Sequence, residues 1–167
     1  MYLCGKFHLN KKIMNREILF RGKRCSDDKW VYGFYVESKH SWQGHKPHKS
    51  WIVPNAISNG GFFNILGRYA VKDDTVGQFT GLLDKHGKQV FGGDIVECVS
   101  WNEYFSKDGQ PMEPFRRKMY VDFRRGGFKM VEPMPESMKD NEWDIIYNGH
   151  IVVIGNRYDN PELLAAK

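Results

Sequence analysis

The chain is poor in cysteine and has no long hydrophobic run. Its three cysteines, Cys4, Cys25 and Cys98, are widely spaced, and no CxxC pair or Cys/His ladder occurs. Without such spacing neither a disulfide framework nor a zinc site is indicated, and a reducing compartment is the natural setting. No window approaches the roughly 18 apolar residues that a membrane-spanning helix needs. We therefore expect a cytoplasmic protein without a membrane partner.

Enzyme signatures are also missing. The sequence contains no phosphate-binding GxxxxGK loop, no GxSxG nucleophile elbow and no HExxH metal motif. Scattered acids such as Asp73, Asp74 and Asp94 are the remaining candidates for a metal-dependent hydrolase, but no local spacing selects them. Asp94 follows two glycines, and we interpret it as a residue that caps a turn through its carboxylate. We expect neither catalysis nor a cofactor.

Helical periodicity is scarce, whereas short alternating segments bounded by Gly, Pro, Asn and Asp are common. The alternation is clearest at residues 30–36 and 118–124, and it predicts strands there. Asn160 and Pro161 predict a short C-terminal helix, with Asn160 as its N-cap. The expected fold is mainly β, a single antiparallel barrel-like domain. We expect long loops at residues 39–49 and 102–114.

The dipeptide Asn148-Gly149 is the strongest hairpin signal in the chain, because both residues tolerate the positive φ angles of a type I′ turn. A two-residue turn at this point would place Ile145 opposite Val152. Both faces of that hairpin are apolar, which is typical of strands buried in the middle of a sheet. We therefore expect a central strand pair here.

Basic residues concentrate in residues 115–130, which hold six Lys or Arg against one acid, Asp122. A turn at Gly126-Gly127 would place Arg124 opposite Lys129, and like charges across a ladder destabilise it mildly. Phosphate groups would relieve that repulsion, and an aromatic ring on the same face could stack on a base for about 1–3 kcal/mol. The candidate nucleic-acid-binding residues are Arg116, Arg117, Lys118, Tyr120, Arg124, Arg125 and Lys129.

A second interpretation of the same stretch needs no ligand. Five acids follow it closely and could neutralise it, within one protomer or across an interface: Glu132, Glu136, Asp140, Glu142 and Asp144. Charged residues on an exposed strand also prevent edge-to-edge aggregation. Both interpretations stand at this point.

Two further groups of side chains lie in segments that we expect to be loops. His40, His45 and His48 are weak candidates for a metal site, because neighbouring lysines would repel a cation and no acid lies nearby to orient a ligand. Trp42 and Trp101 are candidates for an interaction surface, since tryptophans are favoured anchors at protein interfaces. We expect no metal at the histidines.

Three stretches of the sequence form one recognisable pattern. They are Met14-Asn15-Arg16-Glu17-Ile18-Leu19-Phe20-Arg21-Gly22, the segment from Thr75-Val76-Gly77 through Gly93-Asp94-Ile95-Val96, and Val153-Ile154-Gly155-Asn156-Arg157-Tyr158-Asp159-Asn160-Pro161-Glu162-Leu163-Leu164. In their order and spacing they resemble the YopX family of phage and mobile-element proteins. The resemblance implies a β-rich fold with a small barrel around the Gly-Asp-Ile-Val strand. It also implies a prophage or mobile-element origin, a bacterial host, self-association, and no assigned reaction.

Residues 1–13 lie outside the family pattern. They contain three lysines and no acid, so they carry +3 of the chain's net charge of +5. Two interpretations fit this segment: a flexible basic extension, or upstream sequence translated because Met14 is the native start. The expected organisation is therefore an N-terminal extension at residues 1–13 followed by one β domain at residues 14–167.

These observations lead to three functional interpretations. The first is a non-enzymatic binding or assembly module of phage or mobile-element origin, acting as a homo-oligomer, with a protein or nucleic acid as further partner. The second is a nucleic-acid-binding barrel that uses the basic hairpin at residues 116–129. The third is the metal-dependent hydrolase.

Overall fold

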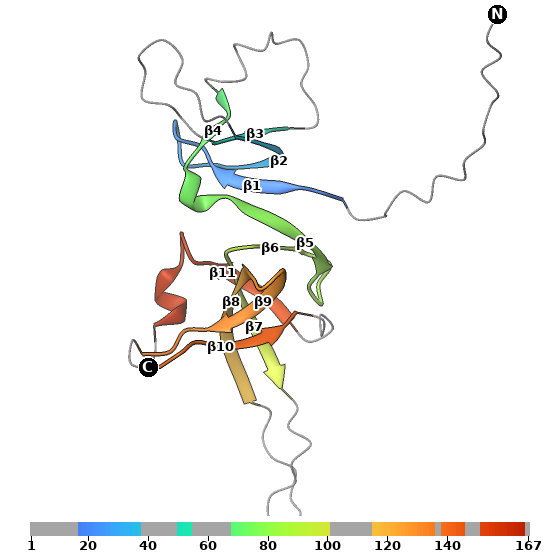
Figure 1. Ribbon diagram of the computed structural model, residues 1–167, viewed down its shortest axis with the longest axis vertical. Coiled ribbons are helices and arrows are strands. Elements are labelled where there is room, and N and C mark those ends of the chain that lie inside the picture. The colour runs from blue at the N-terminus through green and yellow to red at the C-terminus, as the bar shows by residue number, and fades with distance from the viewer. Residues whose placement is uncertain are drawn as a thin grey trace, which may run out of the picture.

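The computed structural model describes residues 17–37, 50–54, 68–100, 115–135, 138–145 and 151–165. In these residues the chain is mainly β and forms two antiparallel sheets, which lie one above the other in Figure 1. The predicted fold class is confirmed to this extent. None of the described helices is long and apolar enough to cross a membrane.

The first sheet has the strand order β4-β3-β2-β1-β5-β6. Its strands are β1 (Phe20–Lys23), β2 (Trp30–Glu37), β3 (Ser50–Val53), β4 (Ala70–Val71), β5 (Gly77–Leu83) and β6 (Gln89–Phe91). The short 3-10 helix η1 (Asp73–Thr75) leads from β4 to β5. Thr75 is buried there, and its hydroxyl accepts a hydrogen bond from the backbone N–H of Lys23, so η1 holds the end of β1 in place.

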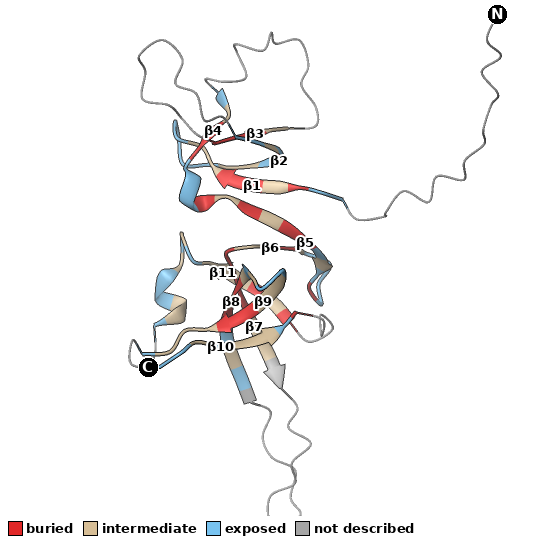
Figure 2. Ribbon diagram, in the orientation of Figure 1, coloured by how far each residue is buried: buried red, intermediate tan, exposed pale blue. Residues whose placement is uncertain are grey.

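The second sheet has the strand order β10-β9-β8-β7-β11. Its strands are β7 (Asp94–Ser100), β8 (Phe115–Arg124), β9 (Gly127–Glu132), β10 (Asn141–Asp144) and β11 (Ile151–Asn156). One face of this sheet carries the larger core cluster, which includes the fully buried Val96, Val121 and Ile151. Figure 2 shows buried residues within the strands of both sheets and exposed residues in the connecting turns.

The turn between β8 and β9 differs from the predicted one. Its central residues are Arg125 and Gly126, both with positive φ (52° and 80°), rather than two glycines. As a result Lys129 pairs with Asp122 instead of Arg124. The observed register places opposite charges across the ladder, which is the favourable arrangement. The predicted repulsion between Arg124 and Lys129 was therefore wrong.

The predicted hairpin between β10 and β11 is not formed. The two strands lie at opposite edges of the second sheet, where β10 pairs with β9 and β11 pairs with β7. Ile145 and Ile151 nevertheless belong to the same core cluster, which extends across the sheet from one edge to the other. Residues 146–150, which include the Asn-Gly dipeptide, lie outside the described residues.

Two finer details of the expected fold were wrong. No closed barrel is found among the described strands, although an isolated antiparallel bridge joins Val71 of β4 to Arg24, directly after β1. The C-terminal helix is only a 3-10 turn, η3 (Pro161–Leu164). Asn160 occupies the predicted N-cap position, but its side chain makes no capping bond, because its oxygen accepts a hydrogen bond from the backbone N–H of Asn156.

Asp84, in the turn between β5 and β6, contacts the outer edge of β11. This contact explains why no further described strand pairs with β11. Its carboxylate accepts a hydrogen bond from the backbone N–H of Val153 at 3.0 Å. The backbone N–H of the next residue, Lys85, donates to the carbonyl of Ile151 at 3.1 Å. A turn of the first half of the chain thus covers the edge strand of the second sheet and fastens the two halves together.

Candidate functional site

A buried ion pair joins the two sheets. Arg21 of β1 donates from Nη2 to Oδ1 of Asp94, the first residue of β7, at 2.6 Å. The two side chains are only 7% and 2% exposed. The second oxygen of Asp94 accepts the backbone N–H of Phe91 at 2.8 Å, which is the turn-capping role expected from the sequence. Both carboxylate oxygens therefore have structural partners.

Aromatic rings surround the guanidinium of Arg21. Its central carbon lies 4.7 Å from the ring centroid of Trp30 and 4.9 Å from that of Phe91. Tyr32 extends this cluster, with its ring centroid 5.6 Å from that of Phe91. The Nε atom of Arg21 is buried and has no hydrogen-bond partner in the described part of the chain. The Arg21 cation therefore contacts one carboxylate and the faces of two aromatic rings. If the carboxylate were removed, burying the cation in this environment would be energetically costly.

Burial raises the pKa of the Asp94 carboxyl, although the Arg21 charge and the Phe91 N–H act in the opposite direction. The net direction means that desolvation outweighs the attraction between the two ions. A buried ion pair of this kind adds little net stability, whereas removing one partner is strongly destabilising. Asp94 therefore fixes how the sheets meet and is not presented to solvent.

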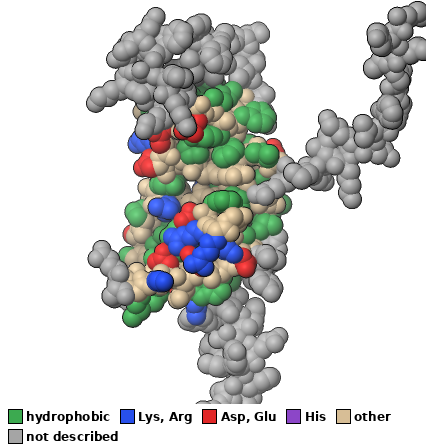
Figure 3. Space-filling model, viewed as in Figure 1, with side chains coloured by type: hydrophobic (Ala, Val, Ile, Leu, Met, Phe, Trp, Pro, Cys, Tyr) green, Lys and Arg blue, Asp and Glu red, His purple; other side chains and the backbone are tan. Residues whose placement is uncertain are grey.

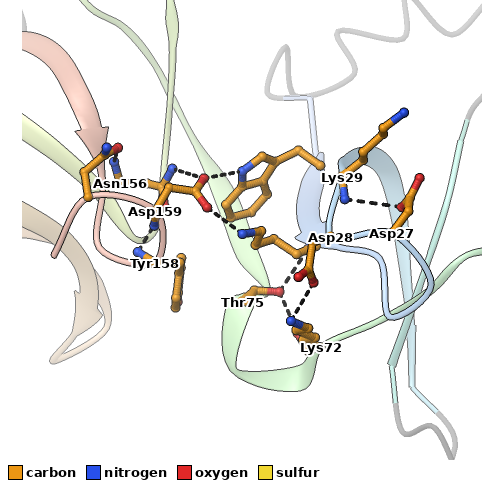
Figure 4. A network of polar contacts seen from close by, with 11 residues as sticks. Asp27, Asp28, Lys29, Lys72, Thr75, Asn156, Tyr158 and Asp159 are labelled. Atoms are coloured by element: carbon orange, nitrogen blue, oxygen red, sulfur yellow. Dashed lines mark hydrogen bonds and ion pairs between the residues drawn. The ribbon is translucent and has the colours of Figure 1, made fainter.

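A second polar cluster closes the same junction from the C-terminal side (Figure 4). Asp159, in the turn after β11, accepts hydrogen bonds from Lys23 Nζ at 2.5 Å, Trp30 Nε1 at 2.8 Å and Asn156 Nδ2 at 2.8 Å. These donors, led by Lys23, lower the pKa of Asp159 to about 2. The C-terminal turn is thereby attached to β1 and β2.

This network predicts a loss of stability in acid. The pKa of Asp159 is lower in the folded chain than its ordinary 3.8, so the stabilisation is complete above about pH 4 and falls as the pH drops toward 2. In urea titrations over this range, Asp159→Asn should reduce stability at pH 7 and flatten the acid decline. Asp74→Asn, at an exposed acid of η1, is the control. An unchanged acid profile in Asp159→Asn would contradict the prediction.

Gly93 allows the C-terminal turn to approach the β6–β7 connection. Its φ is +84°, and a Cβ at this position would lie 2.8 Å from Cε2 of Tyr158. The backbone N–H of Arg157 donates to the carbonyl of Gly93 at 2.9 Å. A glycine is therefore required here for two reasons, the left-handed backbone and the close ring.

The three stretches that resemble the family converge on this junction. Arg21 belongs to the first, Gly93 and Asp94 to the second, and Asp159 to the third. Sequence reasoning identified the stretches but did not single out Arg21 or Asp159. Arg21 follows the apolar residues Ile18-Leu19-Phe20, but Lys23 and Arg24 come directly after it, so the sequence contained no signal that distinguished Arg21 as the buried cation.

The acids considered for a hydrolase do not gather. Asp94 is buried against Arg21, whereas Asp73 and Asp74 are exposed on η1. Within the described ranges, no group of three or more His, Cys, Asp or Glu is arranged to hold a metal ion. The weak metal candidates His40, His45 and His48 and the interface candidates Trp42 and Trp101 lie outside the described residues.

The basic stretch is largely neutralised within the chain. Arg116 pairs with Glu97 of β7 at 2.7 Å, and Arg117 pairs with Glu132 of β9 at 3.2 Å. Lys129 pairs with Asp144 of β10. Acids on the neighbouring strands therefore neutralise much of the basic hairpin within one protomer. The second interpretation of this stretch predicted such pairing.

Arg124 is the centre of the largest of these networks. It contacts Asp122 and Glu142 at 3.0 Å each and Asp140 at 3.2 Å, and it donates to the hydroxyl of Tyr120 at 2.7 Å. These acceptors, led by Glu142, raise the pKa of Arg124 above its ordinary value. Both Arg124 and the Tyr120 hydroxyl are therefore engaged in the fold itself.

An exposed apolar row runs along β2. Tyr32, Phe34 and Val36 point to one face of the strand and are 47%, 56% and 45% exposed. Tyr32 pairs with Arg21 across the ladder, so the row lies on the face of the first sheet that meets the second sheet. On the other side of β2, Phe34 pairs with Val53 of β3, and Val36 pairs with Trp51 of β3.

Comparisons with known proteins agree with the resemblance seen in the sequence. The family model described as "YopX protein" matches residues 19–165, and the chain belongs to the YopX family. No curated protein matches the chain. Among solved structures, it is similar to the crystal structure of protein EF1440 from Enterococcus faecalis, with 22% identity, coverage of 90% of this chain and 99% of that chain, and a TM-score of 0.47.

Proposed function

We propose that the protein is a non-enzymatic binding or assembly module that works as a homo-oligomer in the cytoplasm of a bacterial host, with a phage or mobile-element origin. Membership of the YopX family supports this proposal, together with the use of the motif residues. Arg21, Asp94 and Asp159 lie in the three stretches that resemble the family, and their contacts join strands and turns of the fold.

The observation that carries the proposal is the apolar row of β2. Contiguous apolar side chains are rare on the surface of a monomeric protein and mark interaction sites when they occur. Phe34 is the centre of the row and is more than half exposed, although it lies between two interior strands of its sheet. A fully buried aromatic residue covers about 150–250 Å². Tyr32 and Phe34 still expose about half of their surface, so a partner can bury the rest and the row can supply the centre of an interface.

The oligomeric state tests this proposal. We expect the wild-type protein to sediment as an oligomer at tens of micromolar, and Tyr32→Ser with Phe34→Ser to weaken association at least about 30-fold, the effect of losing one hot-spot residue. Phe123→Ser with Met138→Ser is the matched control, since those side chains are 59% and 60% exposed elsewhere. A wild-type protein that stays monomeric at all concentrations would overturn the assembly proposal.

A further inference from the structure

Three cations on or next to the second sheet are not fully neutralised by the ion pairs described above. Lys118 of β8 and Arg157 of the C-terminal turn are exposed, and neither has a carboxylate partner within the described part of the chain. Arg125 is 81% exposed, and its one ion pair, to Glu142, is long at 3.7 Å. Figure 3 shows Lys and Arg side chains gathered on this face over the second sheet.

These three residues follow one line across the sheet. Lys118, Tyr120 and Arg124 alternate along β8 and therefore share a face. The guanidinium of Arg157 lies 5.2 Å from the Tyr120 ring, and that of Arg124 lies 5.8 Å from the same ring. Arg125 follows directly at the tip of the hairpin. The distance from Lys118 to the tip is about 20 Å at the rise of a β-strand, enough to span several phosphates.

Arg125 occupies its position at an energetic cost. Type I′ turns select Asn, Asp or Gly at the first central position, because other residues are strained at positive φ. Arg125 nevertheless holds φ 52° there, and its long side chain extends into solvent. An added Cβ at Gly126 or Gly127 would meet nothing within 4 Å, so the tip is open to an approaching ligand. Strain retained at an exposed tip is a feature of binding sites.

Arg157 has a different property, close contact with two aromatic rings. Its guanidinium carbon is within 5.2 Å of one tyrosine ring centroid and 5.6 Å of another, Tyr158. A planar cation held in this way can stack on a nucleobase and bind a phosphate at the same time. The flanking cations Arg116, Arg117, Arg124 and Lys129 are already neutralised, which leaves a narrow row of charge rather than a broad basic surface.

We propose that Lys118, Arg157 and Arg125 form a binding row for single-stranded nucleic acid, with Lys118 and Arg125 on phosphates and Arg157 beside a base. A single row of cations matches one phosphate backbone and not the two of a duplex. This site lies on the second sheet and is independent of the apolar row of β2.

Fluorescence anisotropy with a labelled 20-nucleotide thymidine strand tests this site. The two phosphate contacts predict a slope of about −1.4 for log K against log salt, which weakens binding about 7-fold between 50 and 200 mM. The variant with Lys118→Gln, Arg125→Gln and Arg157→Gln should lose at least about tenfold in affinity at 50 mM. A matched control removes the same charge from three exposed lysines of the other half of the chain, Lys29→Gln, Lys85→Gln and Lys88→Gln.

A single substitution separates binding from folding. Arg125→Gly relieves the positive φ and removes the charge, so it should raise Tm by about 2–4 °C while it weakens binding. The proposal is overturned if the wild-type protein does not bind the strand at tens of micromolar, or if the control loses as much affinity as the triple variant. Equal binding of a duplex or of polyglutamate would also overturn it. Normal strand binding by Tyr32→Ser with Phe34→Ser would show that the two surfaces act independently.

Discussion

Arg21→Ala should lower the free energy of unfolding by about 3–5 kcal/mol, the cost of leaving a buried carboxylate without its partner. Asp94 is 2% exposed at its side chain and cannot recover hydration without opening the junction between the sheets. The substitution also removes the cation from the ring faces of Trp30 and Phe91. Urea denaturation followed by tryptophan fluorescence measures the loss, and Trp30 should report the opening directly.

The matching double variant distinguishes an ion pair from a simple packing defect. Arg21→Met with Asp94→Asn keeps the volume, and the Asn oxygen still accepts the N–H of Phe91. Because the double variant leaves no buried charge without a partner, it should be more stable than Arg21→Ala by about 2 kcal/mol or more. Arg116→Ala, at an ion pair whose arginine is 65% exposed, is the control and should cost less than about 1 kcal/mol. Equal losses for Arg21→Ala and Arg116→Ala would contradict this account.

Much of the strand content could be predicted because it depends on local alternation. The bond from Asp94 to the N–H of Phe91 is equally local, since it spans three residues and follows from a carboxylate placed after a turn. The partner of the same carboxylate, Arg21, is 73 residues away in the sequence. No local pattern contains that information, so the role of Asp94 as a link between sheets was visible only in the structure.

The prediction that β10 pairs with β11 was wrong for the same reason. An Asn-Gly dipeptide indicates that a chain reverses, but the choice of partner for β10 was decided by β9, which pairs with it through four residues from Glu132 to Lys129. The charge of residues 115–130 was likewise misleading when counted along the sequence. Glu97, Glu132 and Glu142 come from other strands, and they are brought to the basic residues only by the fold.

Asp84 is the second position where one substitution should have a large effect. Its carboxylate accepts the backbone N–H groups of His86 at 2.8 Å and Lys88 at 2.9 Å as well as that of Val153. Burial alone would raise the pKa of Asp84, but the three N–H groups lower it overall. Asp84→Ala leaves these donors unpaired, one of them at the buried residue Val153, and should cost about 3 kcal/mol.

Substitutions at Asp84 also separate charge from shape. Asp84→Asn keeps the size of the side chain but offers one acceptor oxygen in place of two, so it should cost about half as much as Asp84→Ala. Because the pKa of Asp84 is lowered by folding, its contribution is complete above its ordinary value of 3.8 and is lost as the pH falls below that value. The difference in stability between wild type and Asp84→Asn should therefore shrink in acid. Asp74→Ala, at an exposed acid, should change stability by less than about 0.5 kcal/mol. If hydrogen exchange at the amide of Val153 is as slow in Asp84→Ala as in the wild type, the turn does not hold β11 and the account is wrong.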